Sequence, residues 1–238
     1  MTAVVKPPTD PRHLGRFFYL LLSICTMLVL LPVAEQFRTG VPLLMCGVYA
    51  TMWFAIHAVS GNRRQSFTAV ALSLPVMVLQ LLAAFVGCEL SRRGFIFTWL
   101  AMPLFVAFWF YITLAILRAF LAADVFTRDK LCGAICVFLL IGITWATLYL
   151  WLQHVSSGAF FLALPGDAIR ETITPTQAIY FSYLTMSTMG YGDIIPGNNL
   201  IRTAAYAQAV AGVLFLSVFI ARVVSLYDRH HESHCAKR

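Results

Sequence analysis

The sequence predicts an all-α membrane protein, and three observations carry this prediction. Of the 238 residues, 60% are hydrophobic and only 11% are charged, whereas soluble domains carry about a quarter charged residues. Six apolar runs contain no Asp, Glu, Lys or Arg, and each approaches the roughly 20 residues that a helix needs to cross a membrane. Basic residues are concentrated in every second segment that connects these apolar runs. Because a helix satisfies its own backbone hydrogen bonds in lipid, we expect six transmembrane helices.

The expected helices follow the six apolar runs in chain order. They are Phe17–Ala34, Val41–Ser60, Phe67–Gly87, Gly94–Leu117, Leu131–Gln153 and Thr203–Ala221. The first run is longer than the apolar core of a secretory signal, and no small-x-small cleavage site follows Pro32 cleanly, so we expect it to be retained. Prolines at positions 75 and 103 interrupt the third and fourth runs, where packing kinks are expected ahead of functional hinges.

The net charge of +7 is distributed as a membrane topology requires. If both termini are cytoplasmic, the cytoplasmic segments hold 12 of the 17 basic residues. The ten acidic residues divide evenly between the two sides, so the excess positive charge lies on one side, as the positive-inside rule predicts. This distribution accounts for the charge without a nucleic-acid partner. We expect a multi-pass plasma membrane protein, and the short cytoplasmic segments favour a bacterial inner membrane.

The first 130 residues form a block of four expected helices that lacks a voltage sensor. Such a sensor needs about 3–4 gating charges per subunit. The fourth helix, Gly94–Leu117, carries none, and only Arg118 follows it. We therefore divide the chain into a membrane scaffold (1–130), a second block with two spans (131–226) and a cytoplasmic tail (227–238) that we expect to be frayed.

A short helix with strong start signals lies between the last two spans. Thr174 is a good N-cap, Pro175 takes the first helical position, and Gln177 completes a Thr-x-x-Gln capping box. The stretch that begins here is too short to cross a bilayer, so it is expected to be re-entrant. It runs directly into the hexapeptide 188–193, Thr-Met-Gly-Tyr-Gly-Asp.

This hexapeptide has the features of a cation-binding backbone. Gly190 and Gly192 admit backbone conformations closed to other L-residues, and alternating them with ordinary residues can aim successive carbonyl oxygens the same way. Four such strands around an axis would form stacked cages of oxygen able to replace the water shell of a monovalent cation, with the hydroxyl of Thr188 at the inner end. The negative end of the short helix's dipole would also favour a cation there.

At these residues the chain resembles the potassium channels that have six transmembrane helices and one pore loop per subunit. The resemblance covers about residues 131–226. It includes the aromatic-aromatic-Ser sequence at 180–182, Ser187 in the place of the first filter threonine, and Asp193 and Pro196 after the filter. The resemblance implies a potassium-selective channel, a homotetramer with fourfold symmetry, and the family's filter mechanism. No cofactor is implied other than potassium ions in the filter, and no enzyme activity is expected.

The resemblance also assigns roles to individual residues. It implies potassium binding along the filter, with support from residues beside it and a hinge in the last helix at Gly212, where close packing is an equal alternative. Five residues at helical spacing on one face of the last helix are expected to line the inner cavity or form a gate. The alternative is that the same residues face lipid or neighbouring helices. The filter residues are Thr188, Met189, Gly190, Tyr191 and Gly192, with potassium at the first four; the supporting residues are Tyr180, Ser187 and Asp193; the cavity face is Val213, Leu216, Ser217, Ile220 and Val224.

Departures from the family pattern leave alternatives open. Met189 replaces the usual Val or Ile, and Leu184 stands where some members place a glutamate that interacts with the filter aspartate. Tyr180 is a candidate to donate its hydroxyl to Asp193 instead. A weakly selective cation pore, a multi-pass membrane enzyme and a non-conducting regulatory subunit are the competing functions. The spans contain no paired carboxylates that could catalyse a reaction within the membrane, which argues against the enzyme.

Histidines and cysteines offer two further, weaker signals. His57 is the histidine within a span, where packing is favoured over pH sensing. The tail segment 229–235 holds three histidines and one cysteine, all of which are types of zinc ligand, but the spacing matches no closed metal site. The six cysteines suggest no disulfide framework.

Overall fold

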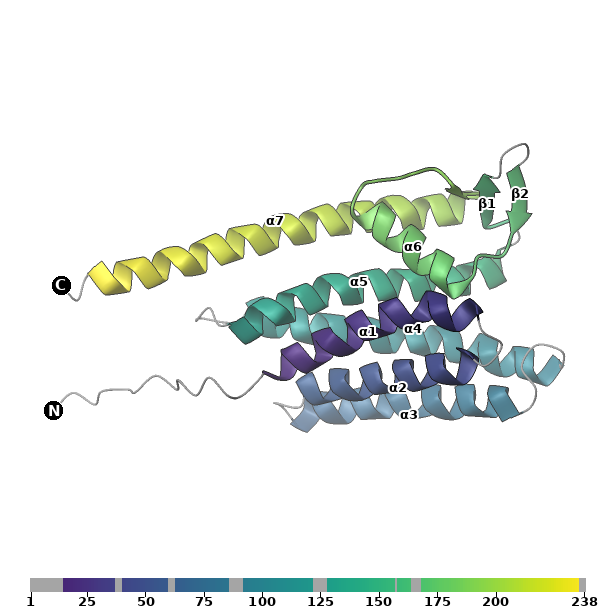
Figure 1. Cartoon of the computed structure of the whole chain (residues 1–238), viewed down its shortest axis with the longest axis horizontal. Coiled ribbons are helices and arrows are strands. Elements are labelled where there is room, and N and C mark those ends of the chain that lie inside the picture. Colours follow the sequence, from purple (N-terminus) through teal and green to yellow (C-terminus); the bar gives the residue numbers. More distant parts are fainter. Residues whose placement is uncertain are drawn as a thin grey trace.

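The computed structural model describes residues 15–36, 40–59, 63–85, 92–121, 128–156, 158–163 and 168–235. These residues form seven helices and a small sheet (Figure 1). The helices are α1 (Arg16–Gln36), α2 (Gly40–Val59), α3 (Arg63–Phe85), α4 (Arg92–Leu121), α5 (Arg128–Val155), α6 (Pro175–Met186) and α7 (Asn199–Cys235). The strands are β1 (Phe160–Ala163), β2 (Ala168–Glu171) and β3 (Ile194–Pro196).

Five of the described helices are long and apolar enough to cross a membrane. They are α1, α3, α4, α5 and α7, and their most apolar windows have a mean hydropathy between 1.6 and 2.4. The apolar part of α2, Met45–Val59, is shorter among the described residues. Within the described residues all six expected spans are therefore helical, while length and composition support five of them as spans.

Helices α1 to α4 pack together and against α5 in one apolar core. Its largest fully buried side chains include Leu20 and Ile24 of α1, Phe108 and Trp109 of α4, and Leu140 of α5. Pro32, Pro75 and Pro103 lie inside α1, α3 and α4, and each of these helices continues past its proline. Half of the residues in the most apolar part of α5 are buried. Helix α5 therefore packs between the first four helices and the rest of the chain.

Helix α7 lies on the other side of α5 and is exposed over most of its surface. Only 11% of its apolar window is buried within the chain. The start of α1 and the end of α7 lie at the same end of the molecule, and the sheet lies at the opposite end (Figure 1). Helix α6 is inserted between α5 and α7 next to the sheet (Figure 1).

Two features differ from the sequence-based expectations. The all-α prediction missed a three-stranded antiparallel sheet with strand order β2-β1-β3. Its strands are three or four residues long, too short to show a readable alternation. The expected frayed tail is also wrong for most of its length, since α7 continues past Leu226 to Cys235. The tail side chains lie outside the described residues, so the zinc hypothesis stays untested.

Candidate ion-conduction site

The short helix α6 begins as its sequence predicts. Thr174 is the N-cap, and its hydroxyl oxygen accepts a hydrogen bond from the backbone N–H of Gln177 at 3.3 Å. The side chain of Gln177 accepts in return from the backbone N–H of Thr174 at 2.9 Å. This reciprocal pair is a capping box, which satisfies two of the helix's unpaired donors. The predicted capping box is confirmed.

A second cap on α6 comes from a distant helix. Glu35, near the end of α1, accepts a hydrogen bond from the backbone N–H of Thr176 at 2.9 Å and another from the hydroxyl of Thr174 at 3.2 Å. A carboxylate at a helix N-terminus is stabilised by the partial positive charge of the helix dipole. Sequence reasoning missed this contact, because nothing in the spacing places residue 35 beside residue 174.

The back of α6 is held by a buried polar network that joins three helices. Gln208 of α7 is fully buried. Its amide donates to the carbonyl oxygen and to the hydroxyl of Ser182, at 2.9 and 2.7 Å, and accepts from the Tyr149 hydroxyl at 2.7 Å. The Ser182 hydroxyl donates in turn to the Gly142 carbonyl at 2.7 Å. Buried polar networks with every member satisfied fix one relative arrangement of their elements.

Two glycines allow this close packing. A Cβ at Gly142 would lie 2.2 Å from the Tyr183 ring, and a Cβ at Gly212 would lie 2.7 Å from the carbonyl oxygen of Met186. Gly212 therefore lets α7 approach the end of α6. Helix α7 continues through this position, so the structure shows the close-packing role, and the hinge stays a prediction.

The chain that follows α6 alternates between backbone conformations. Thr188, Gly190 and Gly192 have φ values of +60°, +50° and +80°, and no other described residue between 188 and 193 has a positive φ. Successive carbonyls point the same way when left- and right-handed residues alternate. Thr188 is β-branched, and such residues rarely adopt a positive φ, so this backbone is strained. Strain of this kind is concentrated at functional sites.

Backbone hydrogen bonds tie the inner end of this segment to α6. The N–H groups of Thr188 and Met189 donate to the carbonyls of Thr185 and Leu184, at 3.2 and 2.9 Å. The hydroxyl of Ser187 donates to the Leu184 carbonyl at 3.2 Å. The segment therefore begins at the C-terminal end of α6, where the helix dipole is negative.

The outer end of the segment is anchored separately. Tyr180 is hydrogen-bonded to Asp193, and this bond is the main reason that the pKa of the Tyr180 hydroxyl is raised above its usual value. The backbone N–H of Ile194 donates to the Asp193 carboxylate at 3.1 Å. Strand β3 then pairs with β1, with Ile194 opposite Leu162. The sheet thus fixes the chain immediately after the segment.

Two large side chains of the segment are exposed in the single chain. Met189 and Tyr191 are 60% and 68% exposed. The five residues of the predicted cavity face of α7 are exposed as well, but so are Leu214 and Val218 on its other sides. The single chain therefore does not distinguish a cavity face from a lipid face.

The inner part of α7 contacts the end of α4. A guanidinium nitrogen of Arg222 donates to the carbonyl of Leu121 at 2.9 Å, and the rings of Phe120 and Phe219 lie 5.8 Å apart. A cation at a helix C-terminus is favoured by the dipole. The sequence analysis counted Arg222 only among the cytoplasmic basic residues. It therefore also missed this contact between α7 and the end of α4.

Comparison with known proteins identifies the segment that carries these features. A family model described as "ion channel" matches residues 137–229. The chain is 33% identical over 75 residues to two pore potassium channel b of Oryza sativa subsp. japonica, covering 32% of this chain and 22% of that protein. It is 42% identical over 55 residues to two-pore potassium channel 4 of Arabidopsis thaliana, covering 23% and 19%.

A prokaryotic relative shows the same similarity. An inward rectifier potassium channel of Paramagnetospirillum magnetotacticum is 36% identical over 88 residues, covering 35% of this chain and 30% of the relative. The chain thus spans about a fifth to a third of the length of these relatives. The helical fold with several apolar helices fits a multi-pass membrane channel, and the comparisons support the potassium channel family for the segment around the filter, pointing to an ion channel and not to an enzyme.

Proposed function

We propose that the chain is the pore-forming subunit of a potassium-selective channel. The observation that carries this proposal is the alternation of positive φ at Thr188, Gly190 and Gly192 immediately after a capped, non-spanning helix. In this reading the carbonyl oxygens of the filter, with the Thr188 hydroxyl, replace the water shell of potassium. Residues 1–130 are the scaffold and residues 131–226 the pore domain.

Each structural support has a part in this mechanism. The capping box and Glu35 hold the start of α6, and the Gln208 network holds its back, so its negative end stays directed at the filter. The Tyr180–Asp193 hydrogen bond and β3 hold the outer end. Because ion binding by carbonyls requires fixed oxygen positions, these contacts preserve selectivity.

Four copies are needed to complete the pore. One chain supplies one filter strand, and its outward side, including Met189 and Tyr191, is exposed. Carbonyls at membrane depth are tolerated only where protein covers them or they line water. A closed cyclic tetramer provides both conditions and covers much of the exposed surface of α7. Both ends of the helical chain then lie on the cytoplasmic side of the plasma membrane, as the charge distribution indicates.

Reversal potentials of purified protein in planar bilayers test the proposal. Under opposed potassium and sodium gradients, the current should reverse near the potassium equilibrium potential, and barium should block it. Gly190→Ala should abolish potassium current while assembly persists, because a φ of +50° disfavours a side chain even where nothing lies within 4 Å of the added Cβ. Gly47→Ala is the matched control, since its Cβ also meets nothing within 4 Å but lies in α2.

Two other outcomes would contradict the proposal. Equal sodium and potassium permeability would support a weakly selective cation pore, the alternative that Met189 and Leu184 leave open. The stoichiometry is tested by native mass spectrometry in mild detergent and in nanodiscs, where a tetramer is expected. A monomer or dimer as the largest species in both would exclude the fourfold filter.

A further inference from the structure

A cavity of about 190 Å³ lies at the centre of the bundle, where six helices meet. Helices α1 to α5 and the start of α6 all contribute to its wall, which is almost entirely apolar. Its residues include Leu31, Phe105, Trp109, Ala146, Pro175 and Ile179. The cavity therefore lies between helices α1 to α5 and the start of α6, and its lining includes none of residues 188–193.

Two of the residues that line this cavity each carry a polar atom that has no hydrogen bond among the described residues. They are the indole N–H of Trp109, a donor, and the side-chain oxygen of Gln80, an acceptor; both atoms are buried. Trp109 as a whole is fully buried. Leaving a buried polar group unpaired costs about 1–3 kcal/mol, and native proteins rarely leave one so without a reason. A buried donor and a buried acceptor on two residues that line the same cavity favour a ligand that can both accept and donate a hydrogen bond.

Water alone does not match the size and chemistry of this space. A water takes about 30 Å³ of liquid volume and needs two to four polar partners, whereas apolar cavities near 150 Å³ stay dry and bind benzene. The two unpaired atoms in the wall could hold one water. Most of the 190 Å³ would then remain an empty apolar space.

We propose that this cavity binds a small hydroxylated hydrocarbon of about the size of phenol. A hydroxyl group accepts one hydrogen bond and donates another, so its oxygen can accept from the Trp109 N–H and its hydrogen can be donated to Gln80. The hydrocarbon part fills the apolar remainder, which gains free energy in proportion to the surface buried. This site is independent of the filter and goes beyond the proposed function.

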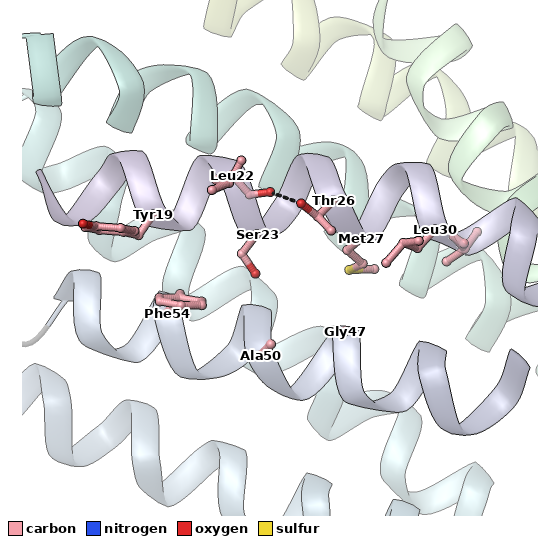
Figure 2. Close-up of a pocket in the computed structure, with 10 residues that line it drawn as sticks. Tyr19, Leu22, Ser23, Thr26, Met27, Leu30, Gly47, Ala50 and Phe54 are labelled. Carbon is pink, nitrogen blue, oxygen red and sulfur yellow. Dashed lines mark hydrogen bonds between the residues drawn. The ribbon is translucent and has the colours of Figure 1, made fainter. Parts of the chain in front are cut away.

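A larger hollow elsewhere in the bundle differs in the way that the proposal requires. The groove between α1 and α2 holds about 270 Å³ and is lined by Tyr19, Ser23, Thr26 and Phe54 among others (Figure 2). The Thr26 hydroxyl already donates to the Leu22 carbonyl at 2.8 Å (Figure 2). This groove contains no unpaired buried polar atom among the described residues, so it provides the internal control.

The test is a fluorine NMR titration of the purified full chain in lipid nanodiscs, with empty nanodiscs to subtract partitioning into lipid. para-Fluorophenol is the probe and fluorobenzene is its apolar counterpart. We expect saturable binding of fluorophenol at one site per chain, at least about tenfold tighter than that of fluorobenzene, since two hydrogen bonds of about 1 kcal/mol each exceed the 1.4 kcal/mol that corresponds to tenfold. Equal affinities, or no saturable binding, would overturn the proposal.

Four single variants and one double variant assign the site. Trp109→Phe keeps a ring but removes the donor, and Gln80→Leu removes the acceptor; each should reduce the affinity advantage of fluorophenol over fluorobenzene, and the double variant should abolish it. Ala146→Leu should fill the cavity and abolish binding of both probes. Gly47→Leu fills the groove between α1 and α2 instead, because nothing lies within 4 Å of its Cβ, and should leave binding unchanged. Loss in Gly47→Leu with retention in Ala146→Leu would place the site in the groove and contradict the proposal.

Folding controls keep these variants interpretable. Each variant should elute as the wild-type oligomer and unfold cooperatively. If Ala146→Leu fails to fold, Trp109→Phe and Gln80→Leu still decide the outcome. Gln80→Leu leaves the wall close to its original volume, whereas Trp109→Phe also enlarges the cavity, which affects both probes. The fluorophenol-to-fluorobenzene affinity ratio therefore reports the hydroxyl contacts in both variants. A ratio that stays tenfold in both variants would overturn the proposal.

Discussion

At the scale of single residues, the backbone of the filter and the glycine beside it set the strictest requirements. Gly212 packs against Met186, and a Cβ there would lie 2.7 Å from a backbone oxygen. A backbone atom cannot move aside as the end of a flexible side chain can. The start of the filter is therefore sensitive to a single methyl group on α7.

Gly212→Ala should displace the end of α6 and lower both stability and potassium selectivity. Overpacking of this kind costs about 1–3 kcal/mol, so the thermal midpoint of the oligomer should fall, and the reversal potential should shift towards that of sodium. Gly47→Ala is the control, since its Cβ meets open space. If Gly212→Ala keeps the thermal midpoint and the reversal potential of the wild type, the close contact between Gly212 and Met186 is not needed for stability or selectivity.

Tyr180→Phe should make the current decay faster during sustained conduction. The change removes the hydrogen bond to Asp193 at the outer end of the filter and leaves the ring. A raised pKa means that this bond stabilises the folded protein fully below the ordinary tyrosine pKa of about 10. Its contribution is then lost as the pH rises through the raised pKa.

The decay rate of wild-type current should accordingly be constant from pH 7 to about pH 10 and should approach that of Tyr180→Phe above it. Recordings in bilayers across this range measure both quantities. Tyr19→Phe, on α1 and stacked on Phe54, is the control for loss of a tyrosine hydroxyl. Identical decay in Tyr180→Phe and wild type at pH 7 would remove the supporting role of this residue.

At the scale of the elements, helices are joined by side chains that cap the end of another helix. Asp129 of α5 accepts from the backbone N–H of Phe17 at the start of α1 at 3.2 Å. Glu35 of α1 does the same for α6, and Arg222 of α7 binds the last carbonyl of α4. Acids lie at N-termini and the base lies at a C-terminus, as the helix dipoles favour. Charges within a largely apolar bundle thus tie the scaffold to both ends of the pore domain.

Glu35→Gln should weaken the tie between α1 and the start of α6 and alter conduction. The exposed carboxylate contributes only about 0.5 kcal/mol through the dipole, so unfolding should change little, while the open probability or decay of the current should change measurably. Asp129→Asn is the matched control, because it removes an equivalent cap from α1. Equal effects of the two changes on conduction would show that the cap on α6 has no special role.

The Gln208 network yields a prediction about stability. Gln208→Leu leaves the Ser182 carbonyl and the Tyr149 hydroxyl without their partner, which should cost about 1–3 kcal/mol. Adding Tyr149→Phe removes one of the orphaned groups. The double variant should therefore be less destabilised than the sum of the two single changes, measured by unfolding of the reconstituted protein. Strict additivity would mean that the two residues do not interact.

At the scale of the whole molecule, we expect voltage to have little effect on opening, because helix α4 carries few charges that could move through the field. One elementary charge moved through 100 mV is worth about 2.3 kcal/mol, so steep gating needs several moving charges. Helix α4 has basic residues at its outer start and Arg118 in its last turn, with none described between them. Arg118 can extend to the headgroups from that position.

We therefore expect a shallow conductance–voltage relation in symmetric potassium. The slope should correspond to about one charge or fewer per subunit and should change little in Arg118→Gln. Bilayer recordings of purified wild type and variant measure it. A steep slope that survives Arg118→Gln would show that a part of the chain regarded here as a passive scaffold moves charge.

The sequence by itself determined the helices, the start of α6 and the glycine-dependent backbone of residues 188–193, whose role as a filter stays a prediction. These depend on local chemistry: apolar runs of membrane length, a capping box within four residues, and glycines at alternate positions. The three-stranded sheet, the Glu35 and Arg222 contacts, the Gln208 network and the central cavity were decided only by the tertiary structure. Each joins residues far apart in the chain, such as Glu35 and Thr176, and packing against α5 and α7 brings them together. The spacing of residues along the sequence does not reveal which distant residues lie close together in the fold.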